Sequence, residues 1–180
     1  TNFGVSTSED SDDYSGSFVD WGTNRIGNYA PNTWRTLTYD EWYYLRHTRT
    51  NANDLVGAAQ VNGVNGLIFL PDNWTCPTGV SFKSGFHSNN GVDYYAAYQT
   101  FTAAEWSLLE AAGAVFLPAA GSRYGSDVNY VRNWGTYWSA SEDTGYNDVY
   151  YLFFASDEAY MEVYSFRDAG QSVRLVKDLQ

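Results

Sequence analysis

The stretch from Trp134 to Val176 constrains the fold most, because its residue pattern predicts only strands. We expect these strands over residues 135–141, 149–155, 159–165 and 171–176. Between the middle two, Ser156-Asp157-Glu158 is typical of a hairpin connection. A chain that ends in consecutive short strands favours a mainly antiparallel sheet in this part of the fold.

Alternation is readable in the strand expected over residues 149–155, because successive side chains of a strand point to opposite faces. The first face, which we assign to the core, carries Tyr150, Leu152 and Phe154. The second, which we assign to an exposed ligand face, carries Tyr151, Phe153 and Ala155. Either assignment leaves aromatic side chains exposed, and an exposed aromatic patch usually marks an interaction site.

Between its regular apolar positions the same stretch is rich in Tyr, Asp, Ser, Gly and Ala. Antibody binding loops share this composition, because Tyr supplies rigid contact area and small residues adapt around it. The composition therefore predicts a binding surface carried on a fixed frame. The candidate ligand-binding residues are Asp143, Thr144, Tyr146, Asp148, Tyr151, Phe153, Ala155, Asp157, Tyr160, Tyr164, Phe166 and Asp168.

The length of 180 residues is typical of one domain. We interpret residues 1–16 as a disordered or linker N-terminus and residues 17–180 as one ligand-binding domain. The net charge of −11 disfavours nucleic acid and anionic membranes as partners, since both attract Lys and Arg. Cys76 is the one cysteine, which excludes an intramolecular disulfide and a cysteine metal cluster. No apolar run is long enough to insert directly into a membrane.

Two helices are predicted by the same capping pattern, a Thr followed three residues later by Glu. Thr38 and Glu41 begin a helix over residues 39–49, and Thr102 and Glu105 begin a helix over residues 103–112. Basic residues near position 49 and Gly113 after the second helix are typical of helix C-termini.

The remaining strands are predicted from short apolar runs bounded by turn residues. We expect an edge or first strand at Ser17–Trp21 and buried strands at Gly66–Leu70 and Ala114–Leu117. We interpret residues 51–65, 74–99 and 119–126 as connections. The elements together indicate an α+β fold, with two helices packed on a small, twisted, mostly antiparallel sheet.

The order of these motifs resembles that of the C-type-lectin-like domains of bacterial and phage surface proteins. The segments that carry the resemblance are WRTLTYDEW, GLIFLP, AGAVFLPAAGSRYG, YWSAS and SVRLV. The resemblance covers about Phe18 to Val176. Most similar are the Fibrobacter-type major paralogous domain and the Bacteroides proteins that retroelements diversify. The resemblance implies a C-type-lectin-like fold and a rigid frame that displays a variable face.

In the diversified relatives, a retroelement rewrites adenines in codons between the Tyr-Trp-Ser strand and the closing strand. The resemblance implies fixed positions at Trp138, Ser139, Leu152, Phe154, Arg167, Gly170 and Arg174. The candidate ligand-binding residues would be the variable ones, and all of them are reachable from an Asn codon by changes in its first two bases. Glu158, Met161 and Glu162 are not reachable in this way.

Other readings of the acids between Glu142 and Asp168 remain open. They could be a solvated face, a ligand face for basic or hydrogen-bond-donating partners, a calcium site, or a glycosidase pair. The sugar-binding calcium motifs Glu-Pro-Asn and Gln-Pro-Asp do not occur, and neither does a Ser-His-Asp spacing, a phosphate loop or a His-Glu-x-x-His motif. Arg35, Arg167 and Arg174 lie beside apolar runs, where we expect them to pair with buried carboxylates or carbonyls.

These observations predict a non-enzymatic receptor-binding domain with an aromatic and acidic face near residues 142–169. We expect no cofactor and no metal. The expected partner is a protein or glycan on another cell or surface, and the expected location is extracellular, on a cell surface or a virion. Two alternatives are a static carbohydrate-binding lectin or carbohydrate-active enzyme, and a structural surface or adhesin-tip domain.

Overall fold

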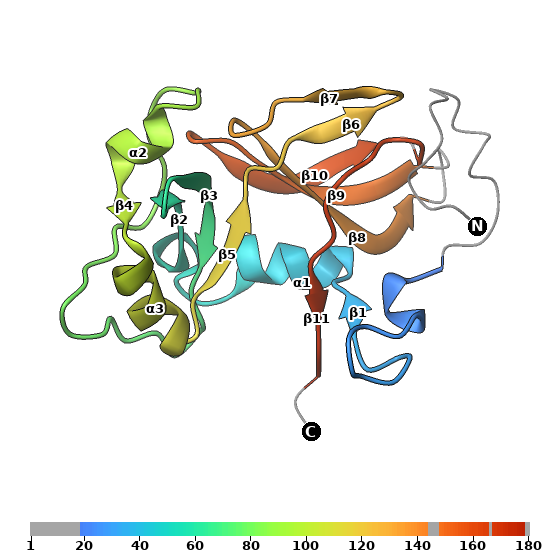
Figure 1. Ribbon diagram of the computed structural model, residues 1–180, viewed down its shortest axis with the longest axis horizontal. Helices are drawn as coiled ribbons and strands as arrows, with labels where there is room; N and C mark the ends of the chain where they lie inside the picture. The colour runs from blue at the N-terminus through green and yellow to red at the C-terminus, as the bar shows by residue number, and fades with distance from the viewer. Residues whose placement is uncertain (1–18, 144–147, 166, 179–180) are drawn as a thin grey trace.

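A computed structural model of the chain describes residues 19–143, 148–165 and 167–178. It combines few helices with several small sheets, as the α+β prediction requires (Figure 1). The N-terminal residues 1–16 that we interpret as a linker lie outside this description.

Two sheets form the frame (Figure 1). The four-stranded sheet has the order β4-β2-β3-β5, built from Thr100–Phe101, Val56–Val61, Val64–Phe69 and Val115–Pro118. The three-stranded sheet has the order β10-β9-β8, built from Ala159–Ser165, Asp148–Phe154 and Gly135–Asp143. Among the pairs of labelled strands in the described residues, only β2 and β4 run parallel. The three strands of the second sheet confirm the predictions for residues 135–165.

Helix α1 (Tyr39–Tyr43) lies between the two sheets and continues as the π-helical η3 (Tyr44–Thr48) (Figure 1). The predicted capping box is present, since the Glu41 N–H donates to Thr38 Oγ1 at 3.2 Å and Glu41 accepts in return. Trp42 is only 2% exposed, and its ring lies 6.1 Å from that of Phe69. The helix therefore begins where the sequence predicts and joins both sheets through one buried indole.

Strand β3 separates two hydrophobic cores, which explains its uninterrupted apolar run. Leu67 and Phe69 enter the main core, while Ile68 and Leu70 enter a second core. The main core also contains Leu37, Trp42, Val56, Ala58, Tyr95, Leu117, Ala119, Tyr137, Leu152, Phe154, Ala159 and Met161. Helix α3 (Ala103–Ala111) covers the second core with Leu109, and its predicted capping box at Thr102 is confirmed.

The predicted strand at Ser17–Trp21 is wrong. Residues 17 and 18 lie outside the described residues, and Trp21–Thr23 forms a short 3₁₀ helix, η2. The Gly22 N–H donates to Asp20 Oδ1 at 2.6 Å, so Asp20 is a helix cap. The local cap overrides the weak strand pattern of Phe18 and Trp21.

The predicted connection over residues 51–65 is also wrong, because it contains the 3₁₀ helix η4 (Ala52–Leu55) and all of β2. Strand β2 contains Gly57, Ala58 and Ala59, and such small residues give only a weak strand pattern. A Cβ on Gly57 would lie 2.8 Å from the Lys83 carbonyl oxygen, so the segment that packs on β2 requires glycine there. Ala58 and Ala59 are completely buried.

Two shorter elements lie in segments that we interpret as connections, and a third follows directly after the segment 119–126. Helix α2 (Tyr94–Tyr98) packs against β2, and β6 (Ser122–Tyr124) pairs with β7 (Asp127–Asn129). The expectation of two helices on one sheet is therefore incomplete. Short elements without strong apolar periodicity are the ones that the sequence pattern misses.

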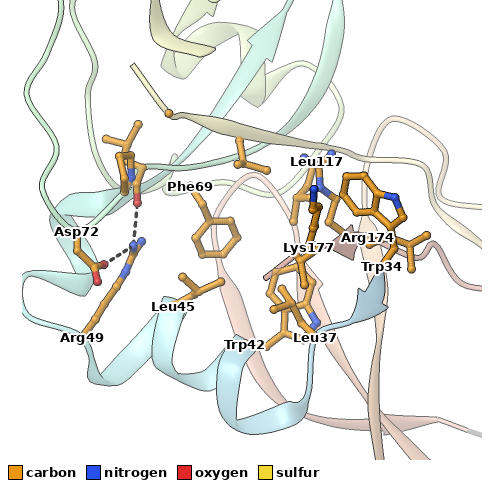
Figure 2. Close-up of a pocket in the computed structure, with 16 residues that line it drawn as sticks. Trp34, Leu37, Trp42, Leu45, Arg49, Phe69, Asp72, Leu117, Arg174 and Lys177 are labelled. Atoms are coloured by element: carbon orange, nitrogen blue, oxygen red, sulfur yellow. Dashed lines mark hydrogen bonds and ion pairs between the residues drawn. The ribbon is translucent and has the colours of Figure 1, made fainter. Parts of the chain in front are cut away.

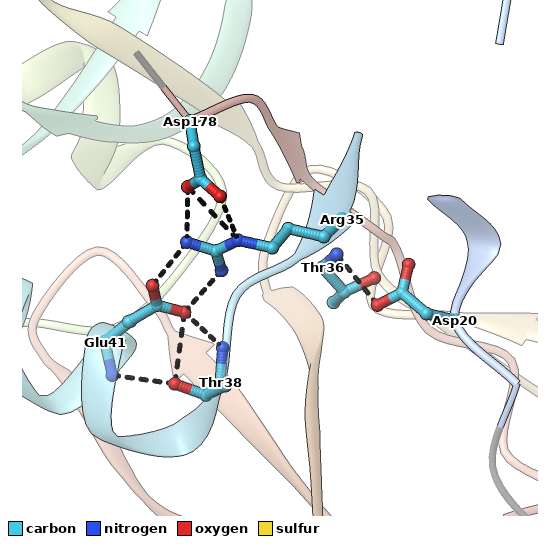
Figure 3. A network of polar contacts seen from close by, with 6 residues as sticks. All are labelled: Asp20, Arg35, Thr36, Thr38, Glu41 and Asp178. Carbon is cyan, nitrogen blue, oxygen red and sulfur yellow. Dashed lines mark hydrogen bonds and ion pairs between the residues drawn. The ribbon is translucent and has the colours of Figure 1, made fainter. Parts of the chain in front are cut away.

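Strand β1 (Arg35–Thr36) pairs with β11 (Leu175–Val176) and joins the two ends of the described chain. The Arg35 guanidinium donates to both Glu41 carboxylate oxygens at 2.7 Å and to Asp178 Oδ1 at 2.8 Å. Asp20 Oδ2 accepts the Thr36 N–H at 2.9 Å (Figure 3). This network, which we call the clasp, fixes the start of α1 relative to both ends.

Candidate functional site

The outer side of the three-stranded sheet carries a row of aromatic side chains. Strand register places Trp138 opposite Tyr151, and Phe153 opposite Tyr160. The alternate residues Tyr137, Leu152 and Phe154 enter the main core on the inner side. We define the aromatic face as Trp134, Trp138, Tyr151, Phe153 and Tyr160.

The rings of the aromatic face contact one another. Phe153 lies 5.4 Å from Trp134 and 5.1 Å from Tyr160, measured between ring centroids. Trp138 and Tyr151 meet edge to face at 6.0 Å. Such pairs hold each other in fixed orientations. The face is therefore a rigid surface, in which few rotamers have to be ordered when a partner binds.

Tyr130 extends this surface beyond the sheet. Its ring stacks on Trp134 at a centroid distance of 3.6 Å, and the residue is 51% exposed. Its backbone φ is +59°, a left-handed conformation that is uncommon for a residue with a side chain. The loop before β8 thus presents an aromatic ring to solvent at a backbone position that costs energy.

Two predicted ligand residues are less exposed than the alternation suggests. Phe153 is only 8% exposed because Trp134 and Tyr160 lie against it. Ala155 is completely buried, and its N–H donates to the Glu158 carbonyl at 2.9 Å in the turn to β10. The expectation of exposure at these two positions is wrong, since neighbouring segments cover the outer side there.

The two tyrosines of the face remain protonated at neutral pH. Burial, and to a lesser degree Tyr160, raises the pKa of Tyr151 to about 12. Burial also raises the pKa of Tyr160, with smaller contributions from the carboxylates of Glu158 and Asp157. Each phenol can therefore donate a hydrogen bond as well as accept one.

Acidic residues gather where β8 and β9 meet the segment after β10. Asp143 and Asp148 are register partners, and Glu142 forms an ion pair with Arg167 at 3.2 Å. Asp148 is 5% exposed, and its Oδ1 has no hydrogen-bond partner among the described residues. Burial, followed by the Asp143 carboxylate, raises the pKa of Asp148, while Arg167 opposes the shift.

The remaining candidates are distributed as follows. Asp157 is half-buried in the β9–β10 turn, and Asp168 is 5% exposed, with neither carboxylate oxygen hydrogen-bonded within the described residues. Thr144, Tyr146 and Phe166 lie outside the described residues. Tyr164 is in register with Tyr150, but its side chain is not described. The structure thus brings Tyr151, Phe153 and Tyr160 together on one face and Asp143 and Asp148 together at its end.

The candidate list from the sequence omits Trp134, Trp138 and Tyr130. Trp138 is adjacent to Tyr151 through strand register, and Trp134 contacts Phe153 from the loop before β8. The contact of Trp138 with Tyr151 follows from pairing residues 135–141 with residues 149–155. No local sequence pattern indicates the contact of Trp134 with Phe153.

Two of the three arginines pair with carboxylates, but these carboxylates are not buried as expected, since the side chains of Glu41, Asp178 and Glu142 are 36%, 73% and 31% exposed. Arg35 pairs with Glu41 and Asp178, and Arg167 pairs with Glu142. Arg174 is exposed and forms no ion pair with any described residue.

Three further observations bear on the class of protein. Among the described residues, no three His, Cys, Asp or Glu side chains are arranged to hold a metal ion. In that same part of the chain, no helix has the length and apolarity to cross a membrane. Comparisons with protein-family models, with curated proteins and with solved structures find no match to this chain.

Proposed function

We propose that this chain is a non-enzymatic ligand-binding domain with a C-type-lectin-like fold, and that the aromatic face and the acids beside it contact the partner. One observation carries the proposal: Trp138, Tyr151 and Tyr160 are half-buried on the outer side of a sheet whose inner side is core. Pre-ordered aromatic rings with polar groups around them are typical of binding hot spots.

The arrangement of elements supports the proposed fold. The helix, strand, helix and strand that carry the resemblance occur in the expected order as α1, β3, α3 and β5. They are followed by the Tyr-Trp-Ser strand β8 and by β11, which closes the chain against β1.

Burial supports a fixed frame at the inner positions, but it does not separate the whole variable set from it, since Asp148, Phe153, Ala155 and Asp168 are at most 8% exposed. Leu152 and Phe154, which the resemblance implies are fixed, are completely buried, and so is Met161, which the codon argument excludes from variation. Tyr151, Asp157 and Tyr160 are only half-buried. We propose that a retroelement diversifies these surface positions and that the partner is a protein or glycan outside the cell, bound from a cell surface or a virion.

The DNA that flanks the gene tests the retroelement directly. A near-copy of the segment encoding residues 133–176, differing only at adenines and lying beside a reverse-transcriptase gene, is the expected result. Its absence from the complete genome would overturn diversification, although a static binding face would still be open to test.

A saturation library tests the separation of frame and face without any knowledge of the partner. Substitutions at Tyr151, Asp157 and Tyr160 should leave most variants folded, as measured by protease resistance of displayed protein. Substitutions at Leu152, Phe154 and Met161 serve as matched positions on the inner side, where most variants should unfold. Equal intolerance at both sets would show that the proposed face is structural.

Tyr130 favours a static lectin as a second candidate function. Its exposed ring, stacked on Trp134, provides a flat apolar surface, and sugars present one apolar face. A glycan array probed with the wild-type domain and with Tyr130→Ala tests this candidate. Binding of one glycan class that the substitution abolishes would support it, while an array without signal would count against it.

A further inference from the structure

A pocket with a volume of about 590 Å³ is lined in part by residues of α1, whereas the aromatic face lies on the outer side of the three-stranded sheet. Helix α1 and η3, strands β3 and β5, and the closing segment 174–177 form its walls. The volume falls in the range of pockets that bind small molecules. The pocket is separate from the proposed ligand face, and an inference about it does not depend on that function.

The middle of the pocket is apolar, and its ends are not. Leu37, Trp42, Leu45, Phe69, Val115 and Leu117 supply the apolar wall. Figure 2 shows Arg49 and Asp72 at one end, and Trp34, Arg174 and Lys177 at the other end. A ligand that fits this pocket would have an apolar body and a polar group at one terminus.

The two ends differ in how their charges are paired. Arg49 donates to Asp72 at 3.1 Å and to the carbonyls of Leu70 and Leu55 at 2.7 and 3.1 Å, so its charge is compensated. Arg174 and Lys177 are exposed and form no ion pair with a described residue. The end beside Trp34 is therefore the end whose two cations have no ion-pair partner in the described part of the chain.

The nearest acid along the chain is Asp178, which follows Lys177. Its carboxylate is bound by Arg35 at 2.8 Å in the clasp, where the same guanidinium also pairs with Glu41. Lys177 lies over the Tyr29 ring at 5.2 Å. Burial raises the pKa of the Tyr137 phenol to about 12, and the Ser172 hydrogen bond and the charge of Arg174 oppose that rise. In a chain with a net charge of −11, two cations at the mouth of an apolar pocket, neither of them in an ion pair with a described residue, are a local reversal of sign.

Hydrogen-bond donors in the lining also lack acceptors. The Trp34 Nε1 and Arg49 Nε atoms are buried, and neither has a hydrogen-bond partner among the described residues. Asp72, the acid of the lining, is engaged by Arg49 and by the Tyr44 hydroxyl at 2.8 Å. The pocket thus offers cations and donors, and what it lacks is an acceptor with negative charge.

We propose that this pocket binds a small amphipathic carboxylate, such as a medium-chain fatty acid. The acyl chain lies along the half-buried Leu45, Val115 and Val176, and the carboxylate lies between Arg174 and Lys177. Burial of the chain supplies most of the affinity, and the two cations fix the orientation.

Calorimetric titration with three probes that each carry a ten-carbon chain tests the proposal, with the two ionic probes below their micellar concentrations and decanol below its solubility limit. Decanoate should bind with one site, decanol should bind at least tenfold more weakly, and decyltrimethylammonium should not bind. The comparison is sharp because the net charge of the protein favours the cationic probe at every non-specific site. Equal binding of the anionic and cationic probes would overturn the proposal.

Variants that lack the positive charges of the pocket test the proposal a second time. The double variant Arg174→Gln/Lys177→Gln should bind decanoate about a hundredfold more weakly, and Lys177→Gln alone about tenfold, because each charged hydrogen bond contributes roughly that factor. The control Arg25→Gln/Lys83→Gln removes the same charge outside the pocket and should bind as the wild type does. Thermal melting confirms that each variant folds.

Two results would contradict the proposed role of Arg174 and Lys177. Equal weakening in the control would assign the effect to net charge alone. Sedimentation that shows self-association of the wild type, lost in the pocket variant and unaffected by decanoate, would assign the pocket to a second copy of this chain.

Discussion

At the scale of single residues, position in the row decides whether an aromatic side chain supports the aromatic face or can contact a partner. Phe153 is nearly buried between Trp134 and Tyr160, whereas Tyr151 and Tyr160 are half-buried at its margins. We infer that Phe153 positions its neighbours and that the tyrosines make the contacts.

Substitution of Phe153 by Ala should therefore cost about 3–5 kcal/mol of unfolding free energy, because it leaves a cavity beneath two rings. Tyr160→Ala, at the margin of the same row, should cost less than half of that. Urea denaturation of the two variants beside the wild type measures the difference. If both substitutions have the same small cost, Phe153 is not the support of the row.

The stability of the protein in acid depends on the carboxylate of Glu41. Hydrogen bonds from Arg35, and then the Thr38 N–H and hydroxyl, lower the pKa of Glu41 to about 2, against the opposing effect of burial. A lowered folded-state pKa stabilises the protein above the unfolded value of 4.5, and this contribution is lost as the pH falls toward 2.

Glu41→Gln should therefore lower stability at pH 6, and the difference from the wild type should shrink progressively between pH 4.5 and pH 2. The measurement is the urea midpoint at each pH. Glu110→Gln, an exposed position on α3, is the control and should follow the wild-type curve. A wild-type–Glu41→Gln difference that is independent of pH would show that the Arg35 contact does not set the protonation of Glu41.

At the scale of elements, the two helix starts share one capping box but not one environment. Thr102 and Glu105 cap α3 on the surface, while Thr38 and Glu41 cap α1 inside the clasp. In the clasp, Glu41 also receives two hydrogen bonds from Arg35. The two capping boxes share one sequence pattern, but the one at α1 is also held by Arg35.

Thr102→Ala should cost about 1 kcal/mol, the usual effect of losing an N-cap. Thr38→Ala should cost more, because Glu41 then loses one of the groups that orient it toward Arg35. Chemical denaturation of both variants measures the two costs. The double variant Thr38→Ala/Arg35→Gln should be less destabilised than the sum of its single variants; strict additivity would contradict the connection.

The elements also show which parts of the fold the sequence could predict. Both capped helices and the strands β3, β5, β8, β9 and β10 were predictable, because their signals are local. Strand β2 was not predictable. Its small residues, such as Gly57, are required because residues 82–85 pack closely on the strand, and this contact joins segments that are distant in sequence. The contact of Trp134 with Phe153 was not predictable either, because it joins a loop to a strand.

At the scale of the whole molecule, the chain is closed by a pair of very short strands. Only two residue pairs join β1 to β11, whereas β9 is paired along most of its length on both sides. Leu175 and Val176 are half-buried, while Leu152 and Phe154 are completely buried. Regions with few buried contacts open locally, without global unfolding.

Amide hydrogen exchange should therefore be at least tenfold faster at Leu175 and Val176 than at Leu152 and Phe154. Low concentrations of urea should leave the fast rates unchanged and increase the slow ones, since only the latter require global unfolding. Nuclear magnetic resonance resolves the four amides. Identical rates and an identical urea response at all four positions would show that the clasp opens only when the whole domain unfolds.

The clasp has a mechanical consequence. Arg35 and Asp178 are 143 positions apart in the sequence yet lie in direct contact, so traction applied to the two ends of the domain acts first on this contact and on the two residue pairs beside it. The strands that carry the aromatic face lie inside the loop that the clasp closes, and they bear no load until it breaks. A tethered domain of this design would yield at its ends under shear while the aromatic face kept its shape.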